Sequence, residues 1–233
     1  YADFMKRFND IKEQWGTFVH VKKNCPELLE KEIEKNKPGH IWLSSVCDCY
    51  QPVEYKYRLT RQILEILLRK KEKFTVEILT KSTLVERDFD LIKEFGENIE
   101  LGMSINSLEE KTSRILEPMA SSPKLRINTL KRAKKEGIKT FGFISPVFPF
   151  TKLEPIFKEL KNAGVKYVWV EILNQRKSTR NKVLKIVRSE LPEEYSKTED
   201  FFKNYYEHCQ KIKEEAKKLG QKYQLKIKDI VVH

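Results

Sequence analysis

The chain has 233 residues, of which 39% are hydrophobic and 34% are charged, and its formal net charge is +12. These fractions are typical of a globular protein, so we expect a folded core in one large domain or in one domain with an appendage. No run of about 18 apolar residues occurs, which argues against a membrane span. The positive charge is suited to a polyanion such as nucleic acid, and equally to the Lys-rich surface of a heat-adapted protein. Because the chain does not begin with Met, we expect it to be part of a longer protein.

The four cysteines, Cys25, Cys47, Cys49 and Cys209, show neither a disulfide framework nor a zinc-binding spacing. This favours a reducing, cytoplasmic setting. The four histidines are dispersed along the chain and suggest no metal site.

Apolar runs alternate with amphipathic stretches along most of the chain. Strands are predicted over 17–22, 41–46, 74–80, 99–105, 140–145, 165–172 and 225–232. Helices are predicted over 26–35, 59–68, 85–95, 109–116, from Pro123 onward, over 153–162 and through most of 179–220. Strands that alternate with helices predict a parallel sheet. We therefore expect an α/β fold, a partial (β/α)6 TIM-like barrel over 1–175 with a C-terminal helical extension over 176–233 that closes the barrel and includes a final strand.

Polar residues gather where the predicted strands end. They include Asp48 after the second strand, Lys81 after the third, Ser104 and Asn106 after the fourth, Ser145 after the fifth, and Glu171 and Asn174 after the sixth. Because the carboxyl ends of parallel strands meet at one rim, this pattern predicts a polar ligand site there. Each residue taken alone is also compatible with a helix cap, and Lys81 with an exposed surface lysine. Lys81 is suited to holding a carboxylate or a phosphate, or to acting as a Schiff-base nucleophile.

Several phrases between Ile41 and Pro149 resemble the spore photoproduct lyase-like branch of the radical S-adenosylmethionine (SAM) superfamily. They are Asp48-Cys49-Tyr50-Gln51-Pro52-Val53-Glu54, Leu59-Thr60-Arg61, Ile78-Leu79-Thr80-Lys81-Ser82, Arg87-Asp88, Met103-Ser104-Ile105-Asn106, Leu116-Glu117-Pro118, Arg126 and Phe143-Ile144-Ser145-Pro146. Upstream, Val21-Lys22-Lys23-Asn24 also fits. The order and spacing of these phrases carry the resemblance.

The resemblance implies a [4Fe–4S] cluster held by a CxxxCxxC loop, with SAM on the open iron. Reductive cleavage of SAM would then yield a 5′-deoxyadenosyl radical that abstracts hydrogen from the substrate. Tyr1 resembles the residue that follows the last cysteine of this loop, so the cluster cysteines are expected just before Tyr1. No metal ligand is expected within the chain itself, which as given is expected to be inactive.

The same resemblance implies the residues that hold SAM. Ser44, Ser45 and Asp48 would meet its amino group with Gln51 or Glu54 nearby, and Lys81 would neutralise its carboxylate. Ser104 and Asn106 would bind the carboxylate or the ribose, and Ile144, Ser145 and Pro146 would lie against the adenine with Glu171 or Asn174 at its polar edge. Arg126 would pair either with SAM or with Glu117.

Ser45 stands where spore photoproduct lyases carry a hydrogen-donating Cys, three residues before Asp48, which leaves thymine-dimer reversal in doubt. Cys47 would either replace that Cys as a catalytic residue or pack beneath the ligand. We expect a nucleic-acid substrate, an external reductant such as a flavodoxin or a ferredoxin, no membrane association and a monomer. The aromatic residues from Phe201 to Tyr206 would stack on bases or form the apolar side of a helix. Two other functions stay open, a Schiff-base (Lys81) barrel lyase or aldolase and a non-catalytic nucleic-acid-binding protein.

Overall fold

The computed structural model describes residues 12–13, 16–43 and 47–233. Its elements, in chain order, are α2 (Cys25–Glu32), β1 (Gly39–Leu43), α3 (Glu54–Tyr57), α4 (Leu59–Leu68), β2 (Phe74–Thr80), η2 (Thr83–Asp88), α5 (Phe89–Glu94), η3 (Gly96–Asn98), β3 (Ile99–Ser104), α6 (Glu110–Leu116), α7 (Pro123–Lys135), β4 (Lys139–Val147), α8 (Leu153–Asn162), β5 (Val168–Ile172), α9 (Lys177–Glu190), η4 (Pro192–Glu194), α10 (Tyr195–Lys203), α11 (Tyr205–Lys222) and β6 (Ile227–Val231).

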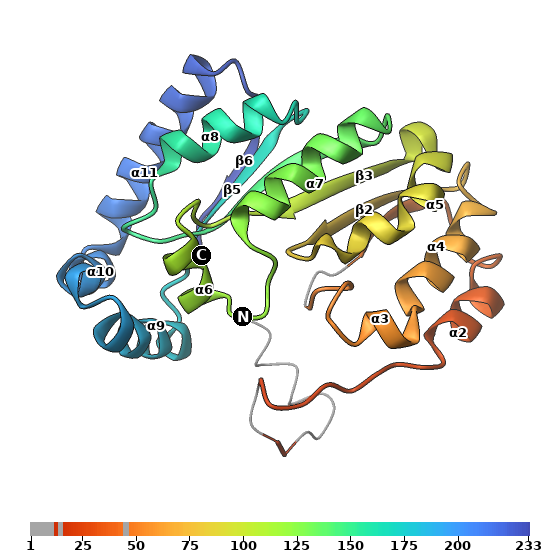
Figure 1. Cartoon of the computed structure of the whole chain (residues 1–233), viewed down its shortest axis with the longest axis horizontal. Helices are drawn as coiled ribbons and strands as arrows, with labels where there is room; N and C mark the ends of the chain where they lie inside the picture. Colours follow the sequence, from red (N-terminus) through yellow and green to blue (C-terminus); the bar gives the residue numbers. More distant parts are fainter. Residues whose placement is uncertain (1–11, 14–15, 44–46) are drawn as a thin grey trace.

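All the strands belong to one six-stranded sheet in the order β1-β2-β3-β4-β5-β6, and every neighbouring pair is parallel. Parallel neighbours need a crossover connection, and here helical segments supply each one. In Figure 1 helices α4, α5, α7 and α8 lie along the outer face of the sheet, whereas α6 and α9 lie on the side toward which the strand arrows point.

The sheet curls strongly across its width. In a flat sheet β1 and β5 would lie about 19 Å apart, because four spacings of about 4.8 Å separate them. The ring centroids of Trp42 on β1 and Trp169 on β5 nevertheless lie only 6.3 Å apart. The six strands therefore form a half-barrel, and side chains from distant strands meet on its concave face.

The convex face carries the main hydrophobic core. Val76 and Ile78 of β2 pack there with Leu64 and Leu67 of α4. At Gly142 of β4 the approach of helix α8 is so close that a Cβ atom would lie 2.6 Å from Leu160 Cδ1. A residue without a side chain is therefore needed at Gly142 for α8 to reach its place on the sheet.

The expected α/β fold with a partial TIM-like barrel is confirmed, and most predicted elements appear within a few residues of their expected bounds. The strand predicted over 17–22 is wrong. None of the described residues of that segment belongs to a strand. Val19 is 54% exposed, so its apolar side chain is not packed in a core. The sixth strand of the barrel is instead the final strand, β6, which pairs with β5.

The region after β5 is mainly helical, as predicted. Phe201, Phe202 and Tyr205 are buried in a second core cluster with Phe148 of the loop after β4, whereas Tyr206 is exposed. This favours the apolar-helix interpretation of these aromatic residues over base stacking. None of the helices in the described part of the chain combines the length and the apolar character needed to cross a bilayer.

Candidate functional site

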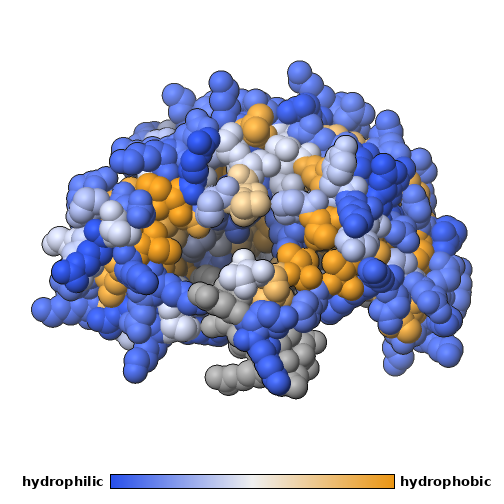
Figure 2. All heavy atoms as spheres, turned by 60° about the horizontal axis from the view of Figure 1, so that its bottom comes forward, coloured by the Kyte–Doolittle hydropathy of each residue, from blue (hydrophilic) through white to orange (hydrophobic). Residues whose placement is uncertain are grey.

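The concave face changes character from the amino to the carboxyl ends of the strands. Residues that alternate with the convex core point to this face. From the amino to the carboxyl end of each strand, these residues are Glu77, Leu79 and Lys81 along β2; Glu100, Gly102, Ser104 and Asn106 along β3; Phe141, Phe143 and Ser145 along β4; and Tyr167, Trp169 and Glu171 along β5. Acidic and aromatic residues thus lie at the bottom, mostly apolar ones in the middle, and polar ones at the carboxyl ends, which we call the rim. Figure 2 views the molecule from the bottom of Figure 1 and shows a hollow in this face, with hydrophobic patches on either side.

A hydrogen-bonded chain joins the rim residues of three strands. Ser104 Oγ donates to the carbonyl oxygen of Ser145 at 3.1 Å, and Ser145 Oγ donates to Glu171 Oε2. The other carboxylate oxygen of Glu171 lies 2.9 Å from His233 Nε2. The convergence of these residues, which the sequence predicts, is therefore present at the ends of β3, β4 and β5.

Lys81 is connected to the other rim residues through the carboxylate of Glu117. Its Nζ lies 3.4 Å from Glu117 Oε1, and the other oxygen of Glu117 lies 2.7 Å from Arg126 Nη1. The Lys81 side chain is 36% exposed, so its ammonium remains accessible to a ligand. Arg126 is fully buried and also donates to the carbonyl oxygens of Ser104 and Ser121. Arg126 thus lies in the pair with Glu117 that the sequence offered as one of two arrangements.

Asn106 differs from its neighbours because its side chain makes no hydrogen bond within the described residues. Its side chain is 1% exposed, and neither its amide nitrogen nor its amide oxygen has a hydrogen-bond partner within the described residues. Asn174 is equally buried; its Oδ1 accepts from Arg176 N, but its Nδ2 has no partner among the same residues. Buried amide groups are almost always hydrogen-bonded, so these two point to a missing polar ligand.

The Asp48 carboxylate is occupied by hydrogen bonds from its own chain. Its Oδ1 accepts hydrogen bonds from Tyr50 N at 2.9 Å and from Thr80 Oγ1 at 2.7 Å, and its Oδ2 accepts one from Lys81 N at 2.7 Å. Asp48 therefore ties the loop after β1 to the end of β2 and fixes the backbone that carries Lys81.

Glu54 and its neighbours form a buried network behind this loop. Glu54 accepts from the backbone nitrogens of Leu59 and Thr60 at the start of α4, and from Arg87 Nη2 at 3.0 Å. Arg87 and Arg61 both bind Asp88, which also accepts from the Tyr50 hydroxyl. Burial raises the pKa of this hydroxyl well above 10.0. Sequence reasoning missed this supporting role, although the charges at these positions were the available signal.

The remaining predicted residues lie in varied places. Gln51 is partly buried, Pro146 is partly buried at the end of β4, and Ile144 belongs to the convex core. Cys47 is exposed. Tyr1, Ser44 and Ser45 lie outside the described residues.

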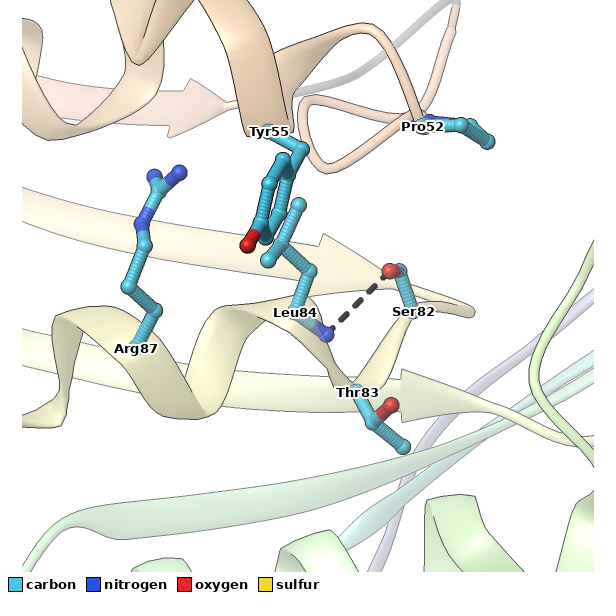
Figure 3. Close-up of a pocket in the computed structure, with 6 residues that line it drawn as sticks. All are labelled: Pro52, Tyr55, Ser82, Thr83, Leu84 and Arg87. Carbon is cyan, nitrogen blue, oxygen red and sulfur yellow. Dashed lines mark hydrogen bonds between the residues drawn. The ribbon is translucent and has the colours of Figure 1, made fainter.

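An open groove of 660 Å³ lies beside the rim (Figure 3). It is lined by Pro52 and Tyr55 from the α3 region and by Ser82, Thr83, Leu84 and Arg87 of β2's end and η2. Ser82 Oγ accepts from Leu84 N and so caps η2. Arg87 already binds Glu54 and Asp88, so the groove offers a ligand few free charges.

In the described part of the chain, no group of three His, Cys, Asp or Glu residues could hold a metal ion. The free cysteines there do not come together either. The described residues therefore do not fit an iron–sulfur cluster, whereas the rim offers one cation, hydroxyl groups and unpaired amides to a small polar ligand.

The α/β half-barrel is the fold that the resemblance to the radical SAM superfamily implies, and the sequence comparisons identify the same family. The chain belongs to the Radical SAM superfamily, whose family model matches residues 14–157. It is 36% identical over 236 aligned residues to an uncharacterized protein of Methanocaldococcus jannaschii, an alignment that covers 100% of this chain and 84% of that protein. It is also 36% identical over 175 residues to an uncharacterized protein of Acidianus two-tailed virus, covering 71% of this chain and 57% of that one.

Solved structures show the same fold at low sequence identity. Spore photoproduct lyase complexed with dinucleoside spore photoproduct superposes with a TM-score of 0.56 at 16% identity, over 82% of this chain and 56% of that one. Streptococcus suis SuiB bound to precursor peptide SuiA also gives 0.56, at 11% identity, over 96% of this chain and 44% of that one. The chain thus spans about half the length of these two proteins.

Proposed function

We propose that the rim binds SAM and that the chain is the SAM-binding part of a radical SAM enzyme acting on nucleic acid. The observation that supports this best is that buried Asn106, after β3, has no hydrogen-bond partner for either side-chain polar atom among the described residues, while Lys81 follows the neighbouring parallel strand β2 with a partly exposed side chain. The Asn106 amide can bind both a donor and an acceptor, and the Lys81 ammonium, which already contacts Glu117 at 3.4 Å, has further donors for a ligand anion. SAM carries a carboxylate, ribose hydroxyls and an adenine edge, and so offers partners to both side chains.

The chain's own residues divide this work. Lys81 would hold the SAM carboxylate, with Glu117 and Arg126 keeping the ammonium at the rim. Ser104, Asn106, Glu171 and Asn174 would bind the ribose and the adenine edge. Asp48 would hold the β1 loop and the end of β2 in place.

In this family SAM, bound to a cluster, supplies a carbon radical that abstracts hydrogen from a substrate. The residues described above bind and orient SAM and keep water from it, because apolar Leu79 and Phe143 lie directly below the rim. The four cysteines of this sequence offer no such site, so we assign the cluster to the cysteine loop that the family resemblance implies before Tyr1.

A nucleic-acid substrate is supported by the fold shared with spore photoproduct lyase and by the net charge of +12. A half-barrel open on one side also admits a large substrate. A Schiff-base lyase is less well supported, because Lys81 Nζ is engaged with the Glu117 carboxylate at 3.4 Å, a contact that the amine would have to give up to attack a carbonyl carbon.

The test uses the full-length protein, reconstituted with iron and sulfide without oxygen and mixed with SAM and a strong reductant. We expect 5′-deoxyadenosine to form, as measured by chromatography. Calorimetric titration of SAM into this chain gives an independent readout, and there we expect saturable binding. Absence of both the product and the binding would refute the proposal.

A further inference from the structure

Two tryptophans lie on the concave face below the rim, Trp169 one layer down on β5 and Trp42 on β1 at the level of Glu77. Trp169 is two residues before Glu171 on β5, which places it about 7 Å further down the strand at about 3.3 Å per residue. Trp42 approaches it from β1, with the ring centroids 6.3 Å apart. We call these two residues the tryptophan pair. Its place in the barrel is the floor beneath the proposed SAM site.

The pair leaves ring surface uncovered. The two ring planes meet at 49°, so neither indole lies flat on the other. Trp42 is 37% exposed, although tryptophan is a residue that folded proteins bury extensively. On one side Lys228 Nζ lies 5.2 Å from the Trp169 ring. An apolar, electron-rich surface held open in this way is suited to a planar ring.

A carboxylate lies next to the pair with unused hydrogen-bonding capacity. Glu77 on β2 is the register partner of Trp42 on β1, so both side chains point to the same face. Glu77 is 3% exposed, and its Oε1 has no hydrogen-bond partner among the residues that the structure describes. Its Oε2 lies 3.7 Å from His40 Nε2. A buried carboxylate oxygen without a donor is costly, and a ligand N–H group would remove that cost.

We propose that the tryptophan pair is a stacking platform for an unpaired base of the nucleic-acid substrate, and that Glu77 selects a base that carries an exocyclic amino group. This inference rests on the proposed function. Aromatic side chains bind the π-faces of bases without regard to sequence, whereas a carboxylate accepts the amino protons of cytosine or adenine. Thymine and uracil present a carbonyl oxygen at that position, which the carboxylate repels.

The test measures binding of short, fluorescein-labelled single-stranded oligonucleotides to this chain by fluorescence anisotropy at fixed salt. We expect oligo(dA) and oligo(dC) to bind more tightly than oligo(dT). We expect Trp42→Ala to weaken oligo(dC) binding about tenfold, the scale of one lost stacking contact. Tyr206→Ala removes an aromatic ring that is 75% exposed on α11, away from the sheet, and should change the affinity less than twofold. Glu77→Gln should remove the preference over oligo(dT), because an amide both donates and accepts.

Three outcomes would overturn the inference. Trp42→Ala could bind oligo(dC) as wild type does. The same variant could lose SAM affinity in parallel, which would assign the platform to the adenine of SAM. A fluorescein-labelled, tyrosine-containing peptide could bind in a way that Trp42→Ala abolishes, while the oligonucleotides do not bind.

The proposed function is tested separately by 5′-deoxyadenosine formation in the wild-type full-length protein without nucleic acid. If that product forms and the oligonucleotide results fail, the platform is wrong and the radical SAM assignment stands. If the product is absent while oligonucleotides bind through Trp42, the protein is a nucleic-acid binder of another kind.

Discussion

The ring of Phe141 on β4 fills the space that a side chain on Gly102 of β3 would need: a Cβ atom there would overlap three atoms of the ring. Gly102↔Phe141 is also a register pair, so the ring lies across its own neighbouring strand. The concave face below the rim is therefore packed by an aromatic residue leaning over a glycine.

We expect Gly102→Ala to lower the free energy of unfolding by about 1–3 kcal/mol, the usual cost of overpacking a filled interior. Urea denaturation measures this cost. Gly39→Ala on β1 is the matched control, since a Cβ atom there would meet only Lys37 O, at 3.9 Å, and its effect should stay within about 0.5 kcal/mol. Equal stabilities of the two variants would contradict the close packing.

Lys81→Ala should weaken SAM binding about tenfold or more, because a hydrogen bond to a charged group contributes about 1.5–3 kcal/mol. Calorimetric titration measures the dissociation constant. Lys135→Ala, on the exposed last turn of α7, removes the same charge from the protein and should leave the SAM affinity unchanged. If both variants bind SAM equally well, Lys81 has no contact with it.

Asn106→Ala should reduce SAM affinity without lowering the melting temperature. The buried amide makes no hydrogen bond within the described residues, so removing it relieves a desolvation cost of about 1–3 kcal/mol and offsets the cavity that remains. Thr198→Val is the contrast, since Thr198 is fully buried and donates to Glu194 O at 2.7 Å. There the melting temperature should fall by about 2–4 °C for each 1 kcal/mol lost. A large fall for Asn106→Ala would mean that the amide is satisfied in the free protein.

Arg126→Met should destabilise the protein by about 3–5 kcal/mol, because it removes one partner of the partly buried Glu117 carboxylate and the donor to the carbonyl oxygens of Ser104 and Ser121. Unfolding in urea gives the value. The double variant Arg126→Met, Glu117→Leu removes both charges and should recover a large part of the loss. Additive losses would show that the two residues do not act as a pair.

Glu77 should make the stability of the protein fall with rising pH. Burial is the main cause that raises its pKa above the ordinary value of 4.5, while Lys228 and His40 act in the opposite direction. The folded state thus holds this proton more tightly than the unfolded state. Its contribution is fully present below pH 4.5 and is lost as the pH rises through the folded pKa. Glu77→Gln, which cannot ionise, should therefore gain stability relative to wild type between pH 4 and pH 7. A difference in unfolding free energy that is independent of pH would contradict this.

The sequence was sufficient for the regular parts of the fold. The helices 59–68 and 153–162 and the strand 74–80 appear with the predicted bounds, because their apolar residues follow one period and each faces one core. The segment 17–22 shows the limit of that approach. An extended apolar-polar alternation is satisfied there without any strand, and only long-range pairing could decide the matter.

The candidate site was partly predictable for a similar reason. Strand ends of a parallel barrel converge whatever their residues, so Ser104, Ser145 and Glu171 could be placed together in advance. The hydrogen-bond partners of each side chain could not be predicted from the sequence. Asp48 and Glu54 have carboxylates like many ligand-binding residues, but the structure uses both to hold backbone nitrogens. The tryptophan pair depends on the curl of the sheet, which no local pattern reports.

The order of the strands has a consequence for biosynthesis. Strand β6 pairs with β5, yet the helices α9, α10 and α11 are made between them. While the ribosome adds these helices, the hydrogen-bonding groups of β5 on that side have no partner, and a neighbouring nascent chain could pair with them. The half-barrel gains its sixth strand only after β6 leaves the exit tunnel, so the sheet cannot be complete until α9, α10 and α11 have all been synthesised.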